Sequence, residues 1–293
     1  MARVSDEQVR EYQGYTAQLF EGVFEALLEI FLGIDISDPE NRRYVADTAV
    51  HNFGHYASFS SDLGRAWYQQ CRDTQSDGKN PYVARAYIND DDYRKLTNDV
   101  YSVLDKVYDE KKTAEEGCEE LAQYVANYVQ KANRDTVIEN LNIENAGVES
   151  APGTPTRVEQ RKELRRYKGG NVTYMRVPSA DCHCAFCLMM ASRGAVYKTL
   201  ESAGGGGDEN KYHLHCRCSV VPVPKNDPLI EGYSTDDYED MYYGAREKWE
   251  HKDYSEDVAK RIERGKANAA KHDREWRDIN EIEIVMRDMY ELH

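Results

Sequence analysis

Residues 179–223 constrain this chain more than any other stretch, because they gather the side chains that bind soft metal ions. They include five of the seven cysteines and three of the eight histidines. Cys184 and Cys187 form a C-x-x-C pair, and His213 begins the later run H-L-H-C-R-C, which ends at Cys218. Two turns that each present two such side chains to one point can complete the tetrahedral coordination of a zinc ion.

This stretch contains more candidate ligands than a four-coordinate ion can use. We expect the zinc ligands to be Cys184, Cys187, His213 and one or both of Cys216 and Cys218. The remaining candidates are then spare: Cys182, His183 and His215. The alternatives are buried free thiols, disulfides and a catalytic centre. Free thiols seldom cluster this densely beside histidines, so the pattern favours a structural metal site.

The same residues resemble the minor head protein family of tailed bacteriophages, the MuF-like group, whose members are sometimes labelled capsid maturation proteases. The family pattern is a C-x-x-C pair followed at a distance by H-x-x-C-R-C and a short Val/Pro strand. In this sequence the pattern falls on Cys184, Cys187, His213, Cys216, Arg217 and Cys218. The resemblance is close over residues 176–223 and extends to the preceding helical region only in general layout. The additional pair Cys182 and His183 departs from the simplest form of the pattern.

The charge of the chain limits the partners that we expect. With 53 acidic and 38 basic residues, the formal net charge is −15, which repels nucleic acid from the molecule as a whole. Residues 157–168 are a local basic exception. They could make a weak contact with DNA or with an acidic partner, or they could form a solvated helix face.

Neither a signal peptide nor a membrane span is expected. The first residues lack an apolar core, and the longest apolar block, 23–34, is short and interrupted by Glu25 and Glu29. We therefore expect synthesis in the host cytoplasm, where reducing conditions favour thiolates bound to metal over disulfides. The resemblance then implies a place in the virion, in the head interior or at the portal vertex.

Apolar residues that recur every three or four positions predict a helical domain over residues 1–145. Helices are expected over 5–33, 38–71, 91–112 and from 113 through 141. Two of them carry capping boxes, Ser5 with Gln8 and Thr113 with Glu116. His51 and His55 lie one turn apart, but no third ligand accompanies them, so we interpret them as surface or packing residues.

A linker rich in proline and glycine, 146–156, separates this domain from the rest of the chain. The next unit, 157–224, is predicted to be a small α+β zinc module with strands at 172–177 and 219–223 and a helix at 188–200. The last unit, 225–293, begins with an acidic segment that we expect to bind a partner or to be partly disordered. It ends in a helix over 255–290. The predicted fold class is mainly α with a small α+β zinc-binding module.

The functional prediction follows from the zinc pattern and the resemblance. It is a structural minor head protein that docks to the portal, major capsid or scaffold protein, with no membrane partner. The first alternative is a prohead protease with a cysteine nucleophile and His213 or His215 as its base. No G-x-S-x-G or H-E-x-x-H motif supports catalysis. The second alternative is a zinc-stabilised regulatory module that binds protein or nucleic acid.

Overall fold

The computed structural model describes residues 2–76, 82–145, 172–179, 184–195, 218–272 and 276–292. The described part is mainly helical with one small sheet, as the sequence predicted. The proposed linker 146–156 and the basic segment 157–168 lie outside the described residues. Within the described residues, no helix combines the length and the apolar character needed to cross a bilayer.

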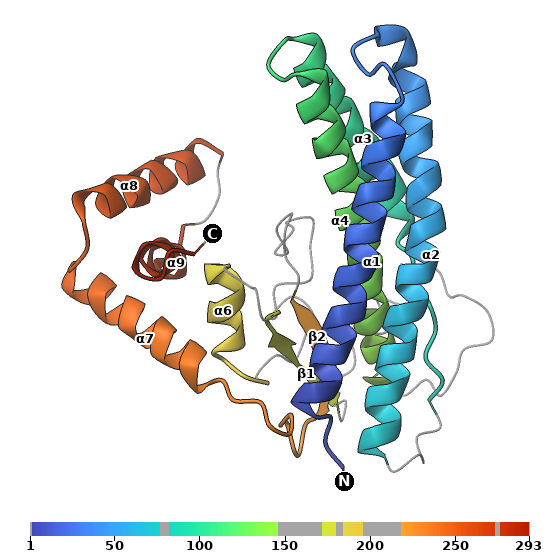
Figure 1. Ribbon diagram of the computed structural model, residues 1–293. Helices are drawn as coiled ribbons and strands as arrows, with labels where there is room; N and C mark the ends of the chain where they lie inside the picture. Colours follow the sequence, from blue (N-terminus) through green and yellow to red (C-terminus); the bar gives the residue numbers. More distant parts are fainter. Residues whose placement is uncertain are drawn as a thin grey trace.

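Four long helices form a bundle: α1 (Asp6–Leu32), α2 (Arg42–Gln75), α3 (Asp90–Tyr108) and α4 (Ala114–Asn145). A short 3-10 turn, Pro39–Asn41, precedes α2, and α4 packs against each of the other three helices (Figure 1). The predicted capping boxes are confirmed. Gln8 N–H donates to Ser5 Oγ at 3.2 Å, and Glu116 N–H donates to Thr113 Oγ1 at 3.1 Å. Both helix starts are therefore encoded by local sequence.

Helices α1, α2 and α4 run the length of the bundle, and a different element packs against them at each end. At the end where α3 lies, apolar side chains from all four helices fill one core, including Phe31, Phe53, Leu104 and Leu121. Because α3 is shorter than the others, the far halves of α1, α2 and α4 pack instead against a sheet and the segment around Tyr82. The sheet therefore completes the bundle core.

The sheet consists of two antiparallel strands, β1 (Val172–Val177) and β2 (Ser219–Pro224), with Val172 opposite Pro224 and Val177 opposite Ser219. All residues of both strands are buried. Side chains of the bundle donate hydrogen bonds to strand carbonyls: Trp67 Nε1 to Val220 (3.3 Å), Gln75 Nε2 to Pro222 (2.6 Å) and Gln13 Nε2 to Val177 (3.1 Å). These bonds satisfy backbone groups that two strands alone leave unpaired.

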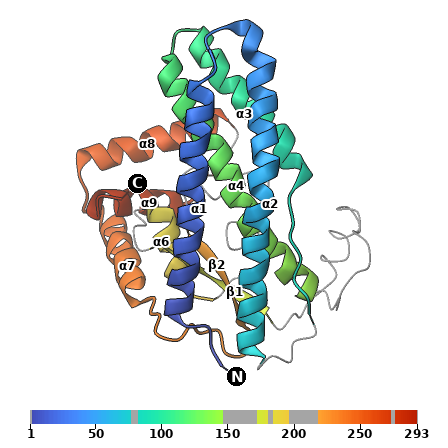
Figure 2. The same ribbon diagram turned by 45° about the vertical axis from the view of Figure 1, so that its right-hand side comes forward.

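Four further helices form a third core beside the bundle: α6 (Ala185–Ala191), α7 (Asp236–His251), α8 (Glu256–Lys271) and α9 (Asp278–Met289). Figures 1 and 2 show this unit on one side of the long helices, with α6 next to the sheet. In the structure, α9 packs against α6, α7 and α8.

Several predicted boundaries were wrong, each for a local reason. The helix predicted at 188–200 is α6, which begins three residues earlier because Cys184 caps it, and which ends before a turn containing Gly194 at φ 58°. The third helix ends at Tyr108, and Glu110 then adopts a left-handed φ of 56°. The acidic segment, expected to bind a partner or to be partly disordered, contains α7.

The single helix predicted over 255–290 is two helices, α8 and α9. Trp276, in the connection between them, lies so close to Gly265 on α8 that a Cβ there would be 2.3 Å from the indole ring. The indole of Trp276 packs onto α8, and helical periodicity does not encode this contact. Met189 and Met190 are buried.

Candidate metal centre

Three of the five predicted zinc ligands are described, and they lie together. Cys184, Cys187 and Cys218 form one cluster, against which Phe186 packs, and each thiol-bearing residue is at most 4% exposed. The first two come from the start of α6, and the third directly precedes β2. His213 and Cys216 lie outside the described residues, as do the predicted spares Cys182, His183 and His215. The fold thus brings the C-x-x-C pair close to Cys218, the last cysteine of the run H-L-H-C-R-C.

The geometry at the C-x-x-C pair comes from the start of a helix. Cys184 is the N-cap residue of α6 with an extended backbone, and its Sγ accepts a hydrogen bond from the backbone N–H of Cys187 at 3.4 Å. A backbone donor aimed at a sulfur stabilises negative charge on that sulfur. This local turn therefore suits a cysteine that acts as a thiolate ligand.

An arginine that our sequence analysis did not single out lies beside the thiols. Arg176 is in β1, only 1% exposed, and its Nη2 is 3.5 Å from Cys187 Sγ. Its guanidinium carbon is 5.4 Å from the centre of the Phe186 ring. The available signal was one charged residue within the otherwise uncharged strand V-T-Y-M-R-V. Charged side chains are rarely fully buried without a specific partner, and the contacts of Arg176 with Cys187 and Phe186 place it beside the thiol cluster.

The other two described cysteines differ from the cluster. Cys71 lies in the core shared by the bundle and the sheet, and Cys118 lies in the core of the four-helix end. Burial raises the pKa of both thiols, which keeps them neutral. Among the five described cysteines, no two are joined by a disulfide.

The donor types in the cluster fit a zinc ion, but the described residues do not form a complete site. Within the described ranges, no group of three or more His, Cys, Asp or Glu side chains is arranged so that it could hold a metal ion. His51 and His55 are exposed on α2, and the His55 ring contacts the rings of Tyr56 and Phe59 at 5.1 and 5.2 Å. This matches the surface or packing role predicted for them.

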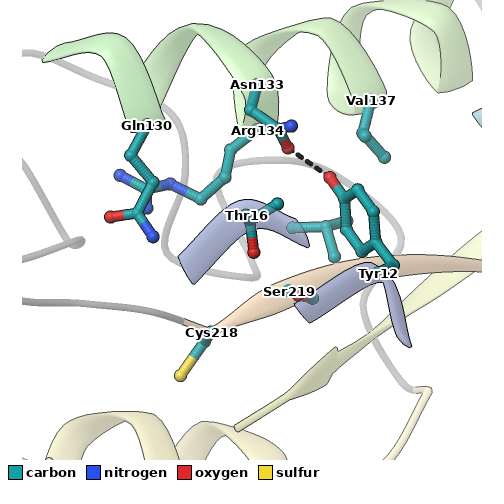
Figure 3. A pocket seen from close by; sticks show the side chains of 9 residues that line it. Tyr12, Thr16, Gln130, Asn133, Arg134, Val137, Cys218 and Ser219 are labelled. Atoms are coloured by element: carbon teal, nitrogen blue, oxygen red, sulfur yellow. Dashed lines mark hydrogen bonds between the residues drawn. The ribbon is translucent and has the colours of Figure 1, made fainter. Parts of the chain in front are cut away.

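A small pocket adjoins the cluster between α1, α4 and β2 (Figure 3). In its wall, Tyr12 donates a hydrogen bond to Asn133 and stacks on Trp67 with ring centres 4.5 Å apart. Cys218 also lines the pocket, but its sulfur points away from Tyr12 and Asn133 (Figure 3). The wall formed by Tyr12 and Asn133 is therefore a packing contact between helices and is separate from the thiols.

Comparison with known proteins places the chain in a family. A family model described as VG15 protein matches residues 3–245, which span the bundle, both strands, all the candidate ligands and most of α7. Searches of curated proteins and of solved structures found no match. The family name denotes a viral gene 15 protein, which indicates a phage protein. Because the match covers well over half of the sequence, the chain belongs to the VG15 family.

Proposed function

We propose that this protein is a structural minor head protein of a tailed phage or prophage, that it docks to the portal or the inner capsid during head assembly, and that it holds one structural zinc ion. The observation that carries the proposal is that cysteines from two separate sequence motifs meet in one buried cluster within a viral family chain. The resemblance of residues 176–223 to MuF-like proteins supports the more specific role in the head.

The ligands that we propose are Cys184, Cys187 and His213, together with one or both of Cys216 and Cys218; of these, Cys184, Cys187 and Cys218 lie in the described cluster. Thiolate and imidazole are the ligands that zinc prefers in closed structural sites. When bound, the ion would supply a crosslink between the start of α6 and the start of β2. Such a crosslink contributes directly to folding, because a two-stranded sheet and a seven-residue helix have little core of their own.

The burial of the thiols favours this structural role over the prohead protease. A nucleophilic cysteine must meet its substrate, whereas Cys184, Cys187 and Cys218 are 4%, 0% and 3% exposed. Thiolates that bind a metal are also poor free nucleophiles. Nothing in the described residues specifically favours the regulatory module.

The docking proposal is tested by co-expressing the full chain with the portal, scaffold and major capsid proteins of the same phage. Sedimentation should show the chain on portal rings or on assembled shells, with the scaffold left uncut. If residues 157–168 also contact DNA weakly, the chain should bind DNA at low salt concentration and release it when the salt concentration is raised. The proposal would be contradicted if the chain sedimented separately although all three proteins and sufficient zinc were present. It would also be contradicted if the scaffold were cleaved in the presence of the chain.

A further inference from the structure

Polar side chains of α4 hold the extended segment 82–89, which leads into α3. Asn140 bonds both backbone groups of Arg85: its Oδ1 accepts from the N–H at 2.8 Å, and its Nδ2 donates to the carbonyl at 2.7 Å. The Thr136 hydroxyl accepts from the N–H of Tyr87 at 3.0 Å and donates to its carbonyl at 2.9 Å. Attachment along this edge of α4 therefore depends on polar groups that satisfy one another.

The start of α3 is attached to the same helix by an ion pair that is only partly satisfied. Asp92 is 0% exposed, and its Oδ2 accepts a hydrogen bond from Lys131 Nζ at 2.7 Å. The same ammonium also donates to Asp135 Oδ2 at 2.6 Å, so one cation serves two carboxylates. The other oxygen of Asp92, Oδ1, is buried with no hydrogen-bond partner among the described residues. Ionised Asp92 is therefore costly, because a buried charge without full compensation has lost its hydration.

The charges around Asp92 do not remove this cost. Burial raises the pKa of the Asp92 carboxyl above its usual value of 3.8 and outweighs the opposite effect of Lys131. Asp135 on α4 raises the pKa further, whereas Lys95 on α3 lowers it. The folded protein thus holds a proton on Asp92 more tightly than the unfolded chain does.

Aromatic side chains pack against the same part of α3. The ring of Phe53 on α2 contacts the rings of Tyr93 and Tyr128, with centres 4.9 and 6.0 Å apart. The Tyr128 hydroxyl donates its hydrogen bond to Asp99 at 2.7 Å, so this proton is already used. These rings add apolar surface near Asp92 but no compensating charge. Protonation removes the buried charge, and a neutral carboxyl group costs less to bury than an ionised one.

We propose that Asp92 is a proton-operated latch: when its carboxylate takes up a proton, the start of α3 is held more tightly against α4. The inference is independent of the zinc site, because every group involved lies in the helical bundle. A carboxyl group whose pKa is higher in the folded state gives stability that is fully present below its unfolded value, near pH 3.8. That stability is lost as the pH rises through the folded value.

The test measures amide hydrogen exchange in residues 82–99 of the full-length protein by mass spectrometry. Asp92→Asn imitates the protonated carboxyl group, so exchange in these residues should be about three- to tenfold slower than in wild type near neutral pH. The difference should shrink as the pH is lowered, because the wild-type carboxylate then takes up the proton itself.

The matched control is Asp105→Asn, on the same helix. The Asp105 side chain is 59% exposed, and its hydrogen bond from Arg42 lowers the pKa of this carboxyl. Its ionised form is therefore the favoured one, and Asp105→Asn should not slow exchange in residues 82–99 at any pH.

A second measurement uses the wild-type protein and does not depend on whether Asp92→Asn folds. The carboxyl carbon of Asp92 is followed by NMR during an acid titration, and it should titrate above its usual value of 3.8. The inference would be overturned by equal or faster exchange in Asp92→Asn than in wild type near neutral pH. It would also be overturned if Asp92 titrated below its usual value. Either result would show that Lys131 fully compensates the buried carboxylate.

Discussion

Single residues set how closely the helices of the bundle approach one another. At Gly64 on α2, a Cβ would lie 2.5 Å from the backbone carbonyl oxygen of Asn133 on α4. Asn133 has little freedom to move away, because its side chain donates to the Ser60 carbonyl at 3.1 Å and accepts from Tyr12. Glycine is therefore required here by the distance between two helices.

Gly64→Ala should lower the free energy of unfolding by about 1–3 kcal/mol, because the added methyl group forces α2 and α4 apart. The control is Gly14→Ala on α1, where a Cβ would meet nothing within 4 Å. That substitution should raise the stability by up to about 1 kcal/mol, since alanine is the better helix former. Denaturant unfolding of both variants measures the difference. Equal effects at the two glycines would show that the close contact does not limit the bundle.

Residue-scale prediction from the sequence succeeded where the determinant is local. Ser5 and Thr113 begin helices through bonds to residues three positions later, and both were predicted. Arg176 was not, because its burial results from the pairing of β1 with β2 and from the packing of α6. One charged residue in an otherwise uncharged strand is a signal that it is unusual, but it does not identify the partners that bury it.

At the scale of elements, one carboxylate links three helices of the C-terminal unit. Glu281 on α9 accepts hydrogen bonds from the indole N–H of Trp249 on α7 and of Trp276, each at 3.0 Å. Lys266 on α8 lies 3.1 Å away. Burial alone would raise the pKa of Glu281, but these three donors together hold it below its usual value of 4.5. The ionised form is therefore the one that holds the helices together.

The pH dependence follows from the direction of that shift. A carboxyl group whose pKa is lower in the folded state stabilises the fold above its unfolded value, near pH 4.5, and this contribution is lost as the pH falls through the folded value. Glu281→Gln should lose about 1–3 kcal/mol at neutral pH and should show a weaker acid dependence than wild type. Indole fluorescence during unfolding is a direct readout, because two of the three tryptophans contact Glu281. An unchanged acid profile would refute the role of this carboxylate.

The elements themselves show where periodicity is sufficient and where it fails. Strand β1 was predicted with its observed bounds, Val172–Val177, from its β-branched and aromatic residues. The division between α8 and α9 was missed, because Trp276 continues an apolar helical stripe in the sequence yet packs back on Gly265. Likewise the start of α6 was misplaced, because the C-x-x-C pair was interpreted only as a ligand pair. Cys184 is also a helix cap.

The whole molecule combines a long helical bundle with a C-terminal helical unit, and the two-stranded sheet lies between them (Figure 1). The sheet completes a core of the bundle on one side, while α6, which carries the C-x-x-C pair, packs with α7 and α9 on the other. A metal ion that joins α6 to β2 would therefore connect both parts of the molecule. Loss of the ion should therefore destabilise the contact between these two parts of the molecule as well as the turn at the start of α6.

The most direct test of this account is the metal content of the purified full-length protein together with its melting curve before and after chelation. The account predicts about one zinc ion per chain and a clear fall in melting temperature when a chelator removes it, because metal binding contributes to folding. A chain that contains no transition metal, and whose melting curve a chelator leaves unchanged, would contradict the account.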